Sequence, residues 1–180
     1  MTEIVIPDPA IVLLVGAAGA GKSSFAVRHF PPDAVLSSDA LREAISGDAA
    51  DQSVTRAAFT HLHRALDRRL AAGLLTVVDA TNVTSAARRS IRRAAARHGV
   101  PVVAIVLHLA HDVVLARNEG RIERRVPREV VDRHLGLLEV ALAHGSLAAE
   151  GYAHVAILRD PDEVSGARIR LLPPSRRPAP

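Results

Sequence analysis

Residues 16–23 read Gly16-Ala17-Ala18-Gly19-Ala20-Gly21-Lys22-Ser23 and fit the pattern G-x-x-x-x-G-K-[ST] at every fixed position. An apolar run typical of a buried strand, residues 11–15, precedes them, and helical periodicity follows over residues 22–29. In such a strand–loop–helix unit, backbone N–H groups of the loop and the helix N-terminus bind phosphates. We therefore predict a nucleoside triphosphate site formed by Gly16, Gly19, Ala20, Gly21, Lys22, Ser23 and Ser24.

The composition singles out Lys22, the one lysine among 23 basic residues. A compact ammonium group can reach the β- and γ-phosphates, whereas a forked guanidinium would fit the loop poorly. Ser23 offers its hydroxyl to Mg²⁺. The chain has no cysteine, which excludes disulfides and thiolate metal sites. No apolar run reaches the length of a membrane span, so we expect no membrane partner and a cytoplasmic protein.

Apolar runs and helical patterns alternate along the rest of the chain. Further strands are predicted at 34–36, 74–78, 102–107 and 154–158, and further helices at 39–45, 54–72, 85–98, 112–121 and 128–149. Unbroken apolar strands between helices predict an α/β fold in three layers: a central, mostly parallel sheet of about five strands with helices on both faces.

The length of 180 residues fits one domain, which we place at residues 1–170. The proline-rich segment 171–180 predicts a tail or linker, which indicates either a longer parent chain or a frayed natural terminus.

The residues around Asp79 favour phosphoryl transfer over hydrolysis. GTPases read guanine with an N-K-x-D motif, which a chain with no second lysine lacks. Asp79 ends the strand 74–78 and is followed by Ala80 and Thr81, so no water-activating glutamate comes next. We expect Asp79 to hold Mg²⁺ through its water shell; the alternative is a strand-end aspartate that caps the loop at residues 81–82.

Asp39 is the candidate general base for an acceptor hydroxyl, because it follows the second predicted strand at the ligand-binding edge of the sheet. It could instead cap the helix that begins at Ala40. Arg42 lies on the same helical face and could hold an acceptor phosphate, or form an ordinary surface pair with Asp39.

Three arginines are predicted on one face of a helix and its extension: Arg117, Arg121 and Arg124. Such a cluster could close over the nucleotide as a lid and neutralise the γ-phosphate. Glu119 and Glu123 lie between these arginines, so the alternative is a helix whose surface is stabilised by salt bridges.

Residues 61–100 carry eight basic and two acidic side chains, which indicates either a polyanionic partner or a solvated helix face. Five arginines of one predicted helix could follow a nucleic-acid backbone: Arg88, Arg89, Arg92, Arg93 and Arg97. The nine histidines show no ligand spacing, and we interpret His61 and His63 as structural.

Taken together, these residues resemble the kinase domain of bacterial polynucleotide kinase-phosphatase, an RNA-repair enzyme. The resemblance spans about residues 8–165. Beyond the loop at 16–23 it depends on four segments in order: S-S-D-x-x-R at 37–42, D-Q-x-V-T at 51–55, V-D-A-T-N at 78–82 and R-N-x-x-R at 117–121.

The resemblance implies ATP-dependent phosphorylation of the 5′-OH end of single-stranded RNA or DNA in nucleic-acid repair. It implies that Asp39 is the general base, that Arg42 grips the phosphate 3′ of the terminal nucleoside, and that lid arginines contact the ATP phosphates. Those lid arginines are Arg117 and Arg121. Residues near the acceptor would be Gln52, Val54 and Thr81.

The family usually joins this kinase to phosphatase and ligase domains, which would be partners in a longer chain. Two other functions remain open from the sequence: a small-molecule kinase, such as a toxin-like sugar-nucleotide kinase, and an NTP-binding regulatory module that transfers nothing.

Overall fold

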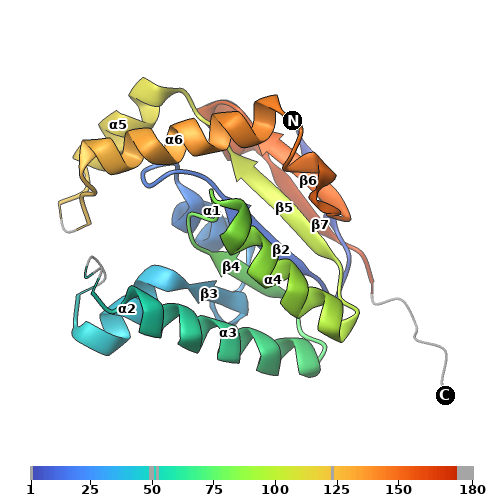
Figure 1. Ribbon diagram of the computed structural model, residues 1–180. Coiled ribbons are helices and arrows are strands. Elements are labelled where there is room, and N and C mark those ends of the chain that lie inside the picture. The colour runs from blue at the N-terminus through green and yellow to red at the C-terminus, as the bar shows by residue number, and fades with distance from the viewer. Residues whose placement is uncertain (1, 49–50, 52, 123, 174–180) are drawn as a thin grey trace, which may run out of the picture.

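The computed structural model describes residues 2–48, 51, 53–122 and 124–173. Its centre is a sheet of five parallel strands in the order β3-β4-β2-β5-β6, with helices on both faces (Figure 1). The strands are β2 (Ile11–Val15), β3 (Val35–Ser37), β4 (Thr76–Asp79), β5 (Val102–Leu107) and β6 (His154–Leu158). The predicted fold class is confirmed.

Burial on both faces explains why the central strands are apolar throughout. Every residue of β2, β4 and β5 is buried, as expected where helices cover both sides of a parallel sheet. Successive side chains of a strand point to opposite faces, so Leu13 packs with Leu62 and Leu66 on one side, while Leu14 packs with Phe25 on the other.

Seven helices surround the sheet in the described part of the chain. They are α1 (Lys22–His29), α2 (Ser38–Ser46), α3 (Thr55–Ala71), α4 (Ser85–His98), α5 (His111–Glu119), α6 (Arg128–Ala143) and α7 (Pro161–Gly166). Short 3₁₀ turns occupy Pro32–Ala34 and Ala148–Glu150. None of these helices is long and apolar enough to cross a membrane.

The sequence analysis missed a separate two-stranded sheet. β1 (Glu3–Ile6) pairs in parallel with β7 (Arg168–Leu171), and Ile4 and Ile6 are fully buried. In β7, arginines alternate with apolar residues, so no continuous apolar run marks this edge strand. β7 includes Leu171, the first residue of the expected tail, and residues 174–180 lie outside the described residues.

Arg88 has a structural role that differs from the predicted contact with a nucleic-acid backbone. Its side chain is only 1% exposed and lies 2.7 Å from Glu150 in an ion pair. It also donates hydrogen bonds to the carbonyls of Asn82 (3.1 Å) and Val83 (2.7 Å), which fixes the loop after β4. Burial opposes ionisation of Glu150, but hydrogen bonds from Arg88 and Tyr152 outweigh it and lower the pKa of this carboxyl.

We expect Arg88→Met to lower the free energy of unfolding by about 3 kcal/mol, because it takes the closest charged partner from the partly buried Glu150, which keeps a longer contact with Arg92 and the hydrogen bond from Tyr152. Arg97→Gln is the matched control: its ion pair with Asp67 is about half exposed, so its loss should change the same quantity by under about 1 kcal/mol. Urea denaturation measures both. Because the pKa of Glu150 is lowered, the stabilisation exists above the ordinary value of 4.5 and disappears as the pH falls below it. Equal effects of the two substitutions would contradict the structural role of Arg88.

Candidate active site

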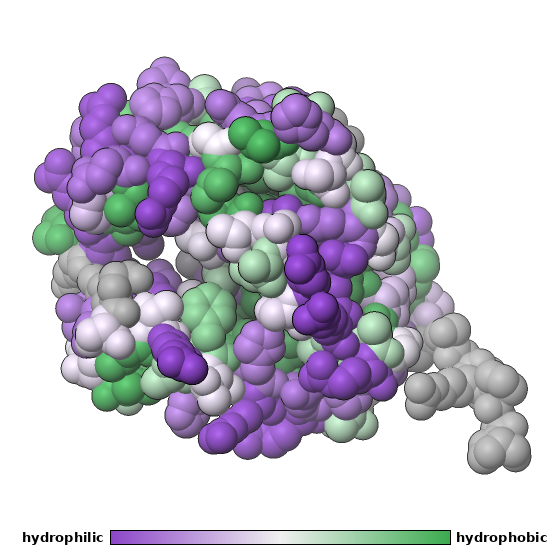
Figure 2. All heavy atoms as spheres, viewed as in Figure 1, coloured by the Kyte–Doolittle hydropathy of each residue, from purple (hydrophilic) through white to green (hydrophobic). Residues whose placement is uncertain are grey.

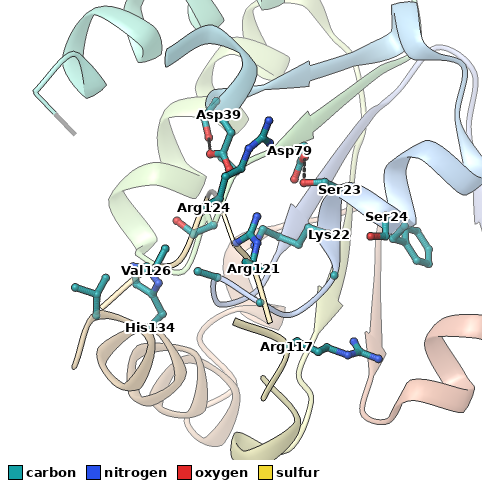
Figure 3. Close-up of a pocket in the computed structure, with 18 of the residues that line it drawn as sticks. Lys22, Ser23, Ser24, Asp39, Asp79, Arg117, Arg121, Arg124, Val126 and His134 are labelled. Atoms are coloured by element: carbon teal, nitrogen blue, oxygen red, sulfur yellow. Dashed lines mark hydrogen bonds between the residues drawn. The ribbon is translucent and has the colours of Figure 1, made fainter. Parts of the chain in front are cut away.

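A cleft of about 760 Å³ opens at the C-terminal ends of β2, β3 and β4 (Figure 3). Ligands of open parallel sheets bind at this edge. Its walls come from the loop 16–23 with α1, the starts of α2 and α3, the end of β4, Arg117 of α5, the segment between α5 and α6 with the first half of α6, and α7. The predicted site residues that the structure describes can be placed relative to this cleft.

The loop 16–23 forms the floor of the cleft around Lys22. The ammonium group of Lys22 is buried and donates hydrogen bonds to the carbonyls of Gly16 (3.0 Å) and Ala17 (2.8 Å). Burial lowers the pKa of Lys22, while the charges of Asp79 and Asp39 oppose that shift. A cation is therefore held in a backbone cradle that two carboxylates face.

Gly19 has no room for a side chain. Its φ is +87°, in the left-handed region, and a Cβ there would lie 2.6 Å from the carbonyl oxygen of Val114 in α5. The loop can follow this path only because glycine lacks a Cβ atom. α5 thus packs directly on the phosphate-binding loop.

We expect Gly19→Ala to weaken ATP binding at least tenfold, because the loop must move away from α5 to admit the methyl group. Gly47→Ala is the matched control: its φ is also positive, +78°, but nothing lies within 4 Å of its Cβ position. Calorimetric titration with ATP should show a large loss for the first variant and little change for the second. Equal affinities would mean that the loop geometry is not needed.

Ser23 and Asp79 form the candidate magnesium site. The hydroxyl of Ser23 donates a hydrogen bond to Oδ2 of Asp79 (2.7 Å) next to the cradle. Burial raises the pKa of Asp79, and the charge of Lys22 and the hydrogen bond from Ser23 act against that rise. Hydroxyl and carboxylate oxygens are the hard ligands that Mg²⁺ accepts, so these two residues fit the ion. Ser24 also lines the cleft.

Other side chains, and not Asp79, hold the loop that follows β4. Asn82 is 3% exposed and donates a hydrogen bond from its amide to the carbonyl of Leu14 (2.8 Å), and Arg88 binds the carbonyls of the same loop. This leaves the Asp79 carboxylate directed at Ser23 (Figure 3).

Asp39 faces the cradle from the opposite wall of the cleft (Figure 3). It does not cap α2: the N-cap is Ser37, whose hydroxyl accepts from the backbone N–H of Ala40 (3.4 Å). The Asp39 carboxylate instead pairs with Arg42 and accepts a hydrogen bond from Ser38 (3.3 Å). Asp39 and Arg42 both line the cleft, with Arg42 9% exposed.

The three lid arginines do not share one helix face, so this prediction was wrong. α5 ends at Glu119, because Gly120 closes the last turn, and Arg121 lies in the segment that follows. Arg117 lines the cleft next to the loop 16–23, with its Nη1 3.5 Å from the carbonyl oxygen of Ala20. Arg121 lies within the cleft, where its charge contributes to the lowered pKa of Lys22 and opposes the rise in the pKa of Asp79.

We call the segment between α5 and α6 the lid segment. Arg124 connects it to α2, because the guanidinium of Arg124 lies 3.3 Å from the carboxylate of Glu43. The alternative prediction, a helix stabilised by surface salt bridges, involved Glu123, which lies outside the described residues. The lid segment is held by Asn118 at the end of α5: its side-chain amide donates to the carbonyl of Val126 (2.7 Å), and its oxygen accepts from the N–H of Val126 (3.1 Å).

The predicted acceptor residues are placed in part. Thr81 lines the cleft. Val54 immediately precedes α3, whose residues Thr55 and Phe59 line the same wall as Asp39. Gln52 lies outside the described residues.

His134 of α6 is a cleft residue that the sequence analysis missed (Figure 3). Its Nδ1 is buried and has no hydrogen-bond partner among the described residues. Burial lowers the pKa of His134, and the charge of Lys22 lowers it further. A neutral imidazole with an unused nitrogen thus stands across the cleft from Asp39. No sequence spacing distinguished this histidine from the other eight.

The fold and the cradle together define a P-loop phosphotransferase architecture. Residues 11–141 match the model of the AAA domain family AAA_33, so the chain belongs to that family. Among curated proteins, none matches this chain.

Solved structures share the fold at low sequence identity. One chain of the Pnkp1/Rnl/Hen1 RNA repair complex has a TM-score of 0.66 at 20% identity, over 77% of this chain and 47% of that one. A chain of the AvrRxo1-ORF1:ORF2 complex with ATP gives 0.69 at 15%, over 84% and 55%. A gluconokinase from Sinorhizobium meliloti gives 0.53 at 19%, over 89% and 88%. The present chain thus corresponds to about half of each of the first two.

Proposed function

We propose that this protein transfers the γ-phosphate of ATP to the 5′-hydroxyl of a polynucleotide. The observation that carries the proposal is the Asp39–Arg42 pair, which faces the Lys22 cradle across one cleft. A carboxylate opposite a triphosphate site suits activation of an alcohol, and a cation beside it suits an acceptor that carries a phosphate near that alcohol.

In the proposed reaction, Asp39 accepts the proton of the acceptor hydroxyl as its oxygen attacks the γ-phosphorus. The bond between that phosphorus and the β–γ bridging oxygen breaks, ADP leaves, and the proton passes from Asp39 to solvent. Phosphoryl transfer requires little beyond such positioning and the stabilisation of charge on the equatorial oxygens.

Two cations of this chain supply that stabilisation. The Lys22 ammonium exchanges the loop carbonyls it now contacts for the β- and γ-phosphate oxygens, and Arg121 approaches the γ-phosphate from the lid. Ser23 and Asp79 would hold Mg²⁺, which adds positive charge at the phosphates. Because no glutamate follows Asp79, the site favours an alcohol acceptor over water.

The choice of a polynucleotide over a small molecule is supported by the sequence order that surrounds the cleft, S-S-D-x-x-R to R-N-x-x-R. Structural similarity to a chain of an RNA repair complex agrees with it. Similarity to a gluconokinase favours the second candidate, a kinase for small hydroxylated metabolites. Arg42 suits either an acceptor phosphate or a carboxylate such as that of gluconate, so the acceptor test below decides between the two candidates.

The test offers γ-labelled ATP and Mg²⁺ with one acceptor at a time: a 5′-OH oligonucleotide, the same oligonucleotide with a 5′-phosphate, and gluconate. We expect label on the 5′-OH oligonucleotide alone. Label on gluconate would favour the second candidate. Tight ATP binding without label on any acceptor would favour a regulatory NTP-binding module.

A further inference from the structure

The outer surfaces of α3 and α4 carry six arginines on one side of the molecule. We call this surface the arginine face; its exposed members are Arg56, Arg64, Arg68, Arg89, Arg93 and Arg97. Figure 2 shows strongly hydrophilic side chains over α4 and along α3. The neighbouring Arg88 and Arg92 do not belong to it, because both pair with the partly buried Glu150.

Few carboxylates neutralise the arginine face. Residues 53–100, all of which the structure describes, contain only Asp67 and Asp79. Asp79 is buried in the cleft, and Asp67 pairs with Arg97 at 2.8 Å. Among the described residues no carboxylate pairs with Arg64, Arg68, Arg89 or Arg93.

The two helices lie side by side and run in the same direction. Contacts between them join His63 to Ser90 (3.3 Å) and Asp67 to Arg97 (2.8 Å), so positions advance together along both helices. Residues four apart share a helix face. Five of the six arginines therefore form two adjacent rows, 64 and 68 on α3 and 89, 93 and 97 on α4.

The two helices that carry the rows begin at or near the cleft. Thr55, the first residue of α3, lines the cleft, and α4 starts at Ser85, four residues after the cleft residue Thr81. From there the helices run away along the sheet (Figure 1). The 17 residues of α3 span about 25 Å. The rows thus form a positively charged surface that extends away from the part of the cleft where Asp39 and Thr55 lie.

We propose that the arginine face binds the phosphates of the polynucleotide acceptor 3′ of the nucleotides held in the cleft. The proposal rests on the function proposed above, since only a polymeric acceptor extends beyond the cleft. Arginine suits phosphate contacts. The rows carry no exposed aromatic ring on which a base could stack, so binding is independent of base sequence and falls with salt.

The test measures binding of a 3′-fluorescent 5′-OH oligonucleotide of about 16 nucleotides, without ATP, as a function of salt. The double variants are R64Q/R68Q and R89Q/R93Q. R168Q/R170Q is the matched control, because it removes two exposed arginines from β7, at the edge sheet. We expect each α3 or α4 variant to lower the slope of log K against log salt by about 1.4, and to raise Kd roughly 20-fold at 0.1 M salt. The control should match the unmodified protein.

A kinetic readout separates this proposal from the proposed function. With ATP, KM for the long oligonucleotide should rise in both variants, whereas kcat and the KM for a 5′-OH dinucleotide should not change. Unchanged affinity and salt slope, or an equal loss in the control, would overturn the proposal even if the protein phosphorylates oligonucleotides. Loss of binding in the variants of a protein that phosphorylates nothing would support the face and contradict the kinase. Displacement of the oligonucleotide by poly-glutamate at equal charge would show a general acidic partner and overturn the proposal.

Discussion

Asp39→Asn should leave ATP binding within a fewfold of the original value and lower the rate of phosphoryl transfer by about 10²- to 10⁴-fold. The asparagine has the same shape but cannot take up the acceptor proton. Asp39 lies on the wall of the cleft opposite the Lys22 cradle. Its substitution should therefore remove none of the groups that we propose bind the ATP phosphates. Calorimetric titration gives the affinity, and single-turnover transfer of labelled phosphate gives the rate.

The substitution also removes the partner of Arg42, so a control must separate lost chemistry from a displaced arginine. Arg42→Gln is that control: it keeps the carboxylate and should raise KM for a phosphate-bearing acceptor more than it lowers kcat. Asp33→Asn, in the exposed turn before β3, should change neither constant. Transfer by Asp39→Asn at the original rate would remove this residue from the mechanism.

Arg121→Ala should lower kcat by a factor on the order of 10³ or more, because an arginine at the γ-phosphate stabilises charge that spreads in the transition state. Arg121 lines the same cleft as Lys22 and Asp79, where we propose that the γ-phosphate binds. The affinity for ADP, which lacks the γ-phosphate, should change much less.

Arg128→Ala is the matched control for that loss. Arg128 begins α6, is largely exposed and contacts Asp132 at 3.8 Å. The substitution removes one positive charge at the start of α6, as Arg121→Ala does in the segment before it, but it removes no side chain that lines the cleft. Similar kcat values for the two variants would show that Arg121 acts only through the overall charge.

The sequence predicted the centre of the sheet because its three inner strands, β4, β2 and β5, are buried on both faces. A strand such as β5, with six buried residues, must be apolar throughout, and such a run is visible without a structure. The residues of the loop 16–23 and Asp79 were predicted for a similar reason: a phosphate cradle tolerates few residue types at fixed spacing, and its position after a strand is fixed.

What the sequence did not predict depends on local geometry or distant contacts. α5 ends before Arg121 because of the turn at Gly120 and the hydrogen bonds between Asn118 and Val126. Neither feature changes the four-residue spacing of Arg117 and Arg121, from which the sequence predicted a continuous helix. The partner of Arg88 is Glu150, 62 residues away. His134 reaches the cleft only because α6 packs over it.

The most direct measurement is a crystal structure with a non-hydrolysable ATP analogue, Mg²⁺ and a 5′-OH oligonucleotide. We predict the 5′ oxygen at about 2.6–3.2 Å from the Asp39 carboxylate and at about 3–3.5 Å from the γ-phosphorus, in line with the bond that breaks. A 5′ end bound elsewhere, or a γ-phosphate turned away from Asp39, would contradict the proposed transfer.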